Sequence, residues 1–401
     1  MRQYIVLSNE AARPATRAIR TRTLAGPFES FQVGTRASTA PEPRIEVQAL
    51  SPHEVTDIRR KPGFACIAPI MRVSLIRPLA AAGADRQDVW GLGAVKADTS
   101  PFTGAGVTVA VLDTGIDTTH PAFARLRERI VQKNFTPSGD EDKQGHGTHC
   151  AGTIFGSQVD GNRIGIAPGI ARALIGKVLD DDGHGDSDMV FKGIQWAVEE
   201  GAHVISMSLG FDFPGSVRAM ADAGWPVELA TSTSLEAYRA NLRMFDALMQ
   251  LIKARAAFGH EPVVVAASGN ESKTDVNPDY KIAASLPAAA EGVISVGALQ
   301  RNSDLYEMAP FSNIFPEVSA PGVGIVSAKI GGGLKALSGT SMACPHVTGI
   351  AALWWEKLEK SGNVSGKLVV DYLRSTARAD VFAANVAVGD RGVGLVTAPQ
   401  Q

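Results

Sequence analysis

Short apolar runs alternate with segments of helical apolar spacing through most of the chain, from residue 104 onward. Strands are predicted at five of these runs, over 109–112, 173–178, 204–207, 263–266 and 293–296. Helices are predicted after His146, over 187–200 and after Ser341, where apolar residues recur every three or four positions. Such apolar strands need cover on both faces. The pattern therefore indicates a mostly parallel sheet between two helical layers, a three-layer α/β fold.

The first 76 residues have a different pattern and predict a small separate α+β domain. Ser51 and Glu54 have the spacing of a capping box, so a short helix is expected to follow. Strands are expected on both sides of this helix, over 2–7, 44–50, 64–70 and 71–75. Residues 77–89 are rich in small side chains and indicate an extended, cleavable linker, which leaves 90–401 as the larger domain.

Segment 211–262 is longer than a compact connection between parallel strands requires. Thr233 and Glu236 give a capping-box signal at the start of a predicted helix, whose apolar residues follow the 3.6 period. These residues are Leu235, Tyr238, Leu242, Phe245, Met249 and Ile252. We favour a crossover helix packed on the sheet with an enlarged surface loop; the alternative is an element that docks a partner or substrate.

Composition places the chain among ordinary globular proteins. Of its 401 residues 45% are hydrophobic and 20% charged, and the net charge of −2 gives no electrostatic reason to expect nucleic acid or a membrane as partner. No apolar run reaches the roughly 18 residues of a membrane span. The apolar stretch near Met1 is too short for a signal peptide. We therefore expect a cytoplasmic protein, unless it is exported by another route or a leader has been removed.

Three cysteines, Cys66, Cys150 and Cys344, are too few and too uneven for a disulfide framework. The simplest interpretation of Cys150 and Cys344 is that they are small buried apolar residues. The alternative is that a thiol reagent at Cys150 or Cys344 crowds a nearby site, because both are close in sequence to candidate catalytic residues.

Three stretches carry candidate chemistry. Ser341 lies among small residues just before an apolar helical run, where a helix N-terminus favours a developing anion, although a helix cap is the alternative for this stretch alone. Asp113 ends the apolar run 109–112, and catalytic groups often occupy this end of a strand in open α/β sheets. His146 lies between two glycines before another apolar segment. The chain order is therefore Asp, His, Ser.

These stretches, Val109–Asp117, Gly145–Gly152 and Ser338–His346, resemble the subtilisin-like serine peptidases, or subtilases, which have the same chain order. The resemblance implies a subtilisin-like three-layer αβα fold preceded by a small propeptide domain. It also implies a serine endopeptidase that works through an acyl-enzyme, with Ser341 as nucleophile, His146 as base and Asp113 orienting the histidine. His149 and Asp117 are the rivals of His146 and Asp113, and we interpret both as structural residues.

The resemblance extends to the oxyanion site and the substrate cleft. Ala267–Glu271 resembles the family's oxyanion segment, so the Asn270 amide and the backbone N–H of Ser341 are the expected donors. The expected edges of the cleft, which bind an extended peptide by strand addition, are Gly183 and Gly185 on one side and Ser208, Leu209 and Gly210 on the other. Ser268 and Gly269 are further candidates for substrate contact. Ser285 is expected at the base of the pocket for the residue before the scissile bond, which favours an apolar side chain there.

No cofactor is expected for the chemistry. In many subtilases a strong calcium site uses an aspartate where this chain has Ala122, together with a loop that corresponds here to residues 157–162. The carboxylate ligand is missing, so we expect that site to be absent. The acidic clusters 140–142 and 180–182 leave a structural calcium site open, with an acidic surface loop as the commoner meaning.

The resemblance also implies an enzyme made as a precursor, whose N-terminal domain is an intramolecular inhibitor and chaperone and whose linker is cut by its own active site. Protein or peptide substrates are the expected partners. Three alternatives stay open: a serine esterase or transacylase, a silent protein-binding relative held inhibited by its own N-terminal domain, and a processing enzyme of narrow specificity.

Overall fold

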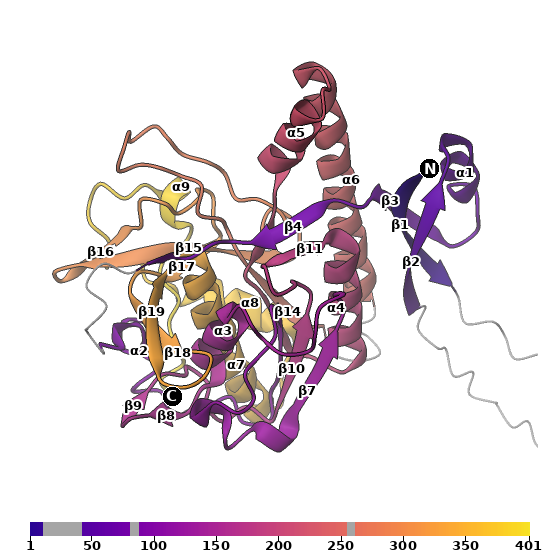
Figure 1. Ribbon diagram of the computed structural model, residues 1–401. Coiled ribbons are helices and arrows are strands. Elements are labelled where there is room, and N and C mark those ends of the chain that lie inside the picture. The colour runs from indigo at the N-terminus through magenta and orange to yellow at the C-terminus, as the bar shows by residue number, and fades with distance from the viewer. Residues whose placement is uncertain (11–41, 81–87, 255–260) are drawn as a thin grey trace, which may run out of the picture.

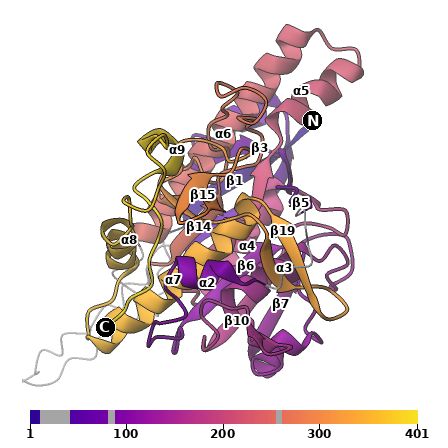
Figure 2. The same cartoon turned by 90° about the vertical axis from the view of Figure 1, so that its left-hand side faces the viewer.

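The fold was determined as a computed structural model, which describes residues 1–10, 42–80, 88–254 and 261–401 (Figures 1 and 2). Its centre is an eight-stranded sheet with the order β16-β15-β14-β12-β6-β10-β7 and β17 beside β15. The strands are β6 (Thr108–Asp113), β7 (Ile130–Asn134), β10 (Arg172–Lys177), β12 (Val204–Met207), β14 (Val263–Ala267), β15 (Val293–Asn302), β16 (Leu305–Met308) and β17 (Val318–Pro321). All pairings are parallel except that of β15 with β16, so the predicted mostly parallel sheet is confirmed.

Alternate residues of the central strand β6 belong to two separate apolar cores. Val109 and Val111 lie in a core with residues of α3 and α7, whereas Ala110 and Leu112 lie in a core with residues of α4 and α6. Successive strand side chains point to opposite faces, so the sheet has a helical layer on each face. The four helices are α3 (His146–Phe155), α4 (Ser187–Glu199), α6 (Val227–Ala254) and α7 (Thr340–Lys360).

Smaller elements complete the larger domain. They are the helices α2 (Trp90–Ala94), α5 (Phe213–Asp222), α8 (Gly366–Ser375) and α9 (Val388–Arg391), the 3₁₀ turns η1 (Pro121–Phe123) and η2 (Arg127–Arg129), and the hairpin of β8 (Gln158–Val159) and β9 (Asn162–Arg163). Among the described helices, none has the length and apolar character needed to cross a bilayer.

The N-terminal domain is an antiparallel sheet with the order β2-β1-β3, covered on one face by α1. Its elements are β1 (Arg2–Glu10), β2 (Glu42–Leu50), α1 (Pro52–Ile58) and β3 (Phe64–Pro69). The predicted capping box is present, because the Ser51 backbone N–H donates to Glu54 and the Glu54 N–H donates back to the Ser51 hydroxyl. The other face of this sheet shares an apolar core with α4 and α6, and Figure 1 shows the domain beside α6.

The predicted strand 71–75 forms, but it does not join the N-terminal sheet. Instead, β4 (Arg72–Leu75) lies antiparallel between β11 (His184–Asp186) and β13 (Leu209–Phe211) of the larger domain. Further on, β5 (Leu79–Ala80) pairs with β19 (Leu334–Ser338), which forms a hairpin with β18 (Ile325–Ala328). The edge strand β3 of the N-terminal sheet could pair with this segment on one side only, whereas β11 and β13 of the larger domain pair with it on both sides. Part of the predicted linker is therefore held in place, and its residues 81–87 lie outside the described residues.

The 211–262 insertion forms a helical hairpin of α5 and α6. The predicted periodic helix is present, but it begins at Val227, so the capping-box signal at Thr233 lies inside α6 and marks no helix start. The backbone N–H of Ala230 donates to the carbonyl of Pro226, so the helix begins directly after this proline. The second half of α6 packs on the sheet, whereas α5 and the start of α6 project from the body of the molecule (Figures 1 and 2).

Candidate active site

Asp113, His146 and Ser341 come together at the carboxyl end of the parallel sheet. Asp113 is the last residue of β6, His146 begins α3 and Ser341 is the second residue of α7. The His146 Nδ1 atom lies 2.8 and 3.0 Å from the two carboxylate oxygens of Asp113, and all three side chains are buried. The structure thus places the three predicted catalytic residues in one site.

The start of α3 is fixed by a carboxylate that the sequence analysis assigned to an acidic loop. Asp142 is buried rather than exposed, and it accepts hydrogen bonds from the backbone N–H of Gly145 and from the N–H and hydroxyl of Thr148. It also accepts from the hydroxyl of Thr114, the residue after Asp113. The Thr114 hydroxyl in turn accepts from the Gly147 N–H. This network joins the end of β6 to the first turn of α3 and therefore sets the position of His146 relative to Asp113.

Glycines are required where α3 meets β6. Gly145 has a φ of 87°, a left-handed conformation that suits glycine. At Gly147 an added Cβ would lie 2.2 Å from the carbonyl oxygen of Gly115, so a larger residue would push the helix away from the strand. Gly145 and Gly147, on either side of His146, are thus required by backbone conformation and by close packing.

The chain's own segment 72–80 runs past Ser341. The Ser341 hydroxyl oxygen lies 3.1 Å from the carbonyl oxygen of Ile76 and 3.4 Å from that of Ser208. A peptide carbonyl is therefore within reach of the predicted nucleophile at the N-terminus of α7.

Asn270 directs its amide toward the same segment. Its Oδ1 accepts hydrogen bonds from the backbone N–H and the hydroxyl of Thr340, both at 2.9 Å, so its Nδ2 must point the other way. That Nδ2 donates to the carbonyl oxygen of Arg77 at 3.1 Å, one residue beyond the carbonyl at Ser341. The predicted oxyanion donor thus lies in the cleft.

Asn313, which the sequence analysis did not identify, holds the loop that carries Asn270. It is fully buried, and its Oδ1 accepts from the backbone N–H groups of Glu271 and Ser272 while its Nδ2 donates to Ser268 and Glu271. An asparagine far along the chain in an ordinary Phe-Ser-Asn stretch gives no local signal for this role.

The predicted cleft edges lie on either side of β4. Gly210 pairs with Ser74 from one side, and His184, between Gly183 and Gly185, pairs with Ser74 from the other. The Leu75 N–H donates to the carbonyl of Gly183 at 2.8 Å. An extended segment thus completes a three-stranded antiparallel sheet, as expected for strand addition.

Two other candidates lie behind the cleft. Ser268 is fully buried, and its hydroxyl donates to the backbone of Asn313, so its side chain does not face the segment. Gly269 packs so closely that an added Cβ would lie 2.3 Å from the Asn313 amide. Both residues support the Asn270 loop through these contacts with Asn313, and their contact with a substrate stays a prediction.

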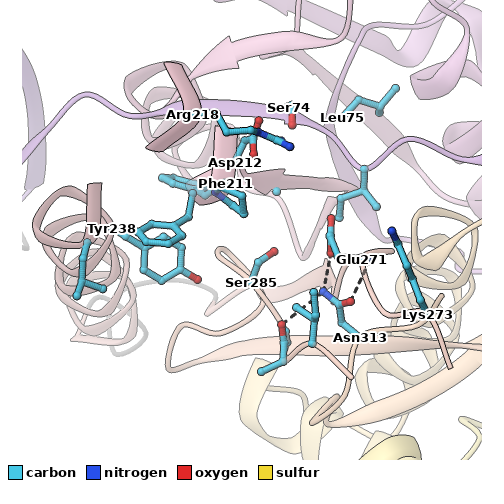
Figure 3. Close-up of a pocket in the computed structure, with 18 residues that line it drawn as sticks. Ser74, Leu75, Phe211, Asp212, Arg218, Tyr238, Glu271, Lys273, Ser285 and Asn313 are labelled. Atoms are coloured by element: carbon cyan, nitrogen blue, oxygen red, sulfur yellow. Dashed lines mark hydrogen bonds between the residues drawn. The ribbon is translucent and has the colours of Figure 1, made fainter. Parts of the chain in front are cut away.

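Ser285 lies at a cavity of about 670 Å³ beside the segment (Figure 3). Ile76 and Gly210 also line this cavity. A Cβ built on Gly210 would lie 3.3 Å from the Ser285 hydroxyl and 3.4 Å from Cγ1 of Ile76. The side chain of Ile76 therefore lies against the surface where the pocket for the residue before the scissile bond was predicted.

The rival residues have structural partners. His149 points its Nε2 at the carbonyl oxygens of Ile325 and Lys335, and burial followed by the nearby His146 lowers its pKa to about 3. For Asp117, burial alone would raise the pKa, but hydrogen bonds from Thr119 and Gly331 bring it below its ordinary value.

Two of the cysteines are buried within the site. Burial raises the pKa of the Cys150 thiol well above its ordinary value and that of Cys344 to about 11. Cys150 donates to the backbone oxygen of Ser341 at 3.4 Å. Both are buried thiols, in agreement with the simpler of the two sequence interpretations.

The region compared with the strong calcium site is a short hairpin with internal hydrogen bonds. Segment 157–162 forms part of the β8–β9 hairpin, and Ser157 donates through its backbone N–H and its hydroxyl to the carbonyl of the buried Ala122. Among the His, Cys, Asp and Glu side chains of the described residues, the group of at least three whose ligand atoms lie close enough to share one metal ion is Asp113, His146 and Cys150. This grouping is the active site itself. Of the acidic clusters, Asp181 pairs with Lys143 and Lys177.

A buried serine, histidine and carboxylate beside a cleft that holds an extended chain define a serine hydrolase acting on peptides. Comparison with known proteins gives the family. The model of the subtilase family matches residues 104–394, so the chain belongs to this family and is a subtilisin-like serine endopeptidase.

Similar proteins agree with this assignment. An intracellular serine protease of Paenibacillus polymyxa is 36% identical over 62% of this chain and 67% of its own length. Subtilisin BL of Lederbergia lenta is 33% identical over 72% of this chain and 90% of its own length. Alkaline elastase YaB of a Bacillus species is 31% identical over 82% of this chain and 72% of its own length.

Proposed function

We propose that this serine endopeptidase cleaves peptide bonds through Ser341, His146 and Asp113, and that it is made as a self-inhibited, self-processing precursor. The buried His146–Asp113 pair with a peptide carbonyl 3.1 Å from the Ser341 hydroxyl carries the proposal.

Ser341 Oγ attacks the carbonyl carbon as its proton passes to Nε2 of His146. Asp113 accepts from Nδ1 and stabilises the imidazolium that forms. The negative oxygen of the tetrahedral intermediate is met by the Asn270 amide and by the backbone N–H of Ser341 at the start of α7. His146 then gives its proton to the leaving amine, and water releases the acyl group by the same steps in reverse order.

The self-inhibited state is supported by the path of residues 72–80. This segment fills the cleft as β4, while the Ser341 hydroxyl contacts the carbonyl of Ile76 and Asn270 contacts that of Arg77. The two catalytic groups thus contact successive carbonyls rather than a single one. Cleavage at Ile76–Arg77 requires a shift that brings the Ile76 oxygen to the Asn270 amide, and until then the segment blocks other substrates.

The N-terminal domain 1–76 is proposed to hold this segment in place. Its sheet shares an apolar core with α6, and Asn241 of that helix donates to the carbonyl of Pro69 at 2.9 Å. Pro69 is the last residue of β3, and the crossing segment begins shortly after it, at Arg72. Release after cleavage would then free residues 77–401 as the active form.

The test compares the full chain with Ser341→Ala by intact mass over time and by labelling with a fluorophosphonate probe. The wild type is expected to lose its first 76 residues and to be labelled on Ser341, while the variant stays whole and unlabelled. A label at another residue would refute the assignment of Ser341 as the nucleophile. A labelled wild type that never shortens would refute self-processing alone.

A further inference from the structure

A large cavity lies beside the segment that occupies the cleft. Ser74 and Ile76 are two residues apart in an extended chain, so their side chains are on the same face, and both line this cavity. About 670 Å³ stays unfilled with both side chains in place (Figure 3). The chain's own serine and isoleucine therefore leave most of the available space empty.

The α5–α6 hairpin supplies the far wall of this cavity. Phe213, Leu235 and Tyr238 line it, and the Phe213 and Tyr238 rings lie edge to face with centroids 6.0 Å apart. The Tyr238 hydroxyl accepts from the backbone N–H of Leu286 at 3.0 Å, which ties α6 to the segment that carries Ser285. The wall is thus joined to the substrate pocket and is formed by residues of the 211–262 insertion.

The end of the cavity near Ser74 differs from the end near Ile76. Ile76 already lies against Gly210 and Ser285. Ser74 and Arg218 both line the cavity, and Arg218 is exposed (Figure 3). The unfilled space next to the aromatic wall is therefore available to a longer side chain in the place of Ser74.

We propose that the α5–α6 hairpin forms an added subsite for the third substrate residue before the scissile bond, and that this subsite takes a large aromatic side chain. The inference rests on the proposed function, because Ser74 is the third residue before the scissile bond only if Ser341 attacks the carbonyl of Ile76. An aromatic ring would pack on Phe213 and Leu235 and lie within reach of the Arg218 guanidinium. Charge recognition by Arg218 alone is weak at an exposed rim, so the apolar wall decides the class of side chain.

The experiment uses the enzyme produced from the full chain, with active sites counted by the fluorophosphonate. The substrates are internally quenched peptides that copy residues 72–77 followed by alanine, with Ser, Phe, Glu or Lys in the place of Ser74. Mass spectrometry identifies the bond that is cut. The Phe peptide is expected to exceed the Ser peptide in kcat/KM by roughly tenfold, since burying such a ring is worth about that factor.

Leu235→Ala is expected to reduce this Phe-to-Ser ratio about threefold or more. Leu229→Ala is the matched control, because Leu229 is also exposed on α6 but does not line the cavity, and it should leave the ratio unchanged. The Arg218→Ala variant measures how much of the preference among the four peptides comes from the charge of Arg218.

Equal rates for the Phe and Ser peptides would overturn the proposal, as would a Glu preference that Arg218→Ala removes. Cutting at a different bond would overturn the register and the subsite together. A protein that is labelled and cuts all peptides equally refutes only the subsite, whereas an unlabelled protein refutes the proposed function as well.

Discussion

Replacing Asn313 by alanine tests whether the oxyanion loop depends on a single buried side chain. Asn313 Oδ1 accepts from the N–H groups of Glu271 and Ser272, at 3.0 and 3.1 Å; Ser272 is buried, whereas Glu271 is exposed. Each buried donor left without a partner costs about 1–3 kcal/mol. Because the Ser272 donor is the buried one, we expect Asn313→Ala to lower the free energy of unfolding by about 1–3 kcal/mol.

The effect on catalysis follows from the place of Asn270 between the residues that Asn313 holds. One oxyanion donor is worth about 10²–10³ in kcat in subtilisin, and a displaced Asn270 loses part of this, so we expect kcat to fall roughly 10- to 100-fold per active site. Urea unfolding measures the stability. Hydrolysis of a peptide substrate by titrated enzyme measures kcat, and Asn302→Ala is the control because that asparagine is exposed.

A double-mutant cycle separates positioning from general damage. If Asn313 acts through Asn270, adding Asn313→Ala to Asn270→Ala should lower kcat little further. The reasoning is refuted if Asn313→Ala loses stability while each titrated site keeps its wild-type kcat, or if the two losses in kcat simply multiply.

Three further outcomes are expected. Burial lowers the pKa of His149 to about 3 and that of His346 to about 4, so below pH 6.5 the unfolded chain binds protons that the folded chain does not. The free energy of unfolding should then be flat above pH 7 and fall by up to about 3 kcal/mol per pH unit between pH 6 and 4, which urea unfolding across pH will check; flat stability there would contradict it. Buried Cys150 and Cys344 should not react with a thiol reagent in the native protein and should react after unfolding, as a colorimetric thiol titration will report. Gly147→Ala should reduce kcat/KM at least tenfold, because the new methyl group would displace the start of α3, and unchanged kcat/KM would show that the close contact is unimportant.

Features encoded in neighbouring residues were predictable from sequence. The apolar run ending at Asp113 and the capping box at Ser51 depend on residues within one or two turns of each other, and both are found as predicted. Asp142 and Asn313 could not be identified because their partners are distant or are backbone groups without a sequence signature.

The sheet that segment 71–75 joins could not be predicted from the local sequence either. A strand signal states that a segment is extended, but the sheet it joins depends on which unpaired backbone lies nearby in the folded protein. In the same way, the Thr233 signal matched a helix start, yet the helix begins earlier at Val227.

The position of β4 between β11 and β13 has a consequence for what this enzyme can digest. If β4 leaves, as the proposed processing requires, those two edges border a slot that is one strand wide and open only to a chain able to donate and accept hydrogen bonds on both sides at once. A helix satisfies its own backbone and an inner sheet strand already has two neighbours, so neither can enter. Native proteins should therefore be cut at exposed loops and chain ends, and mild unfolding should raise their digestion more than any change in surface charge.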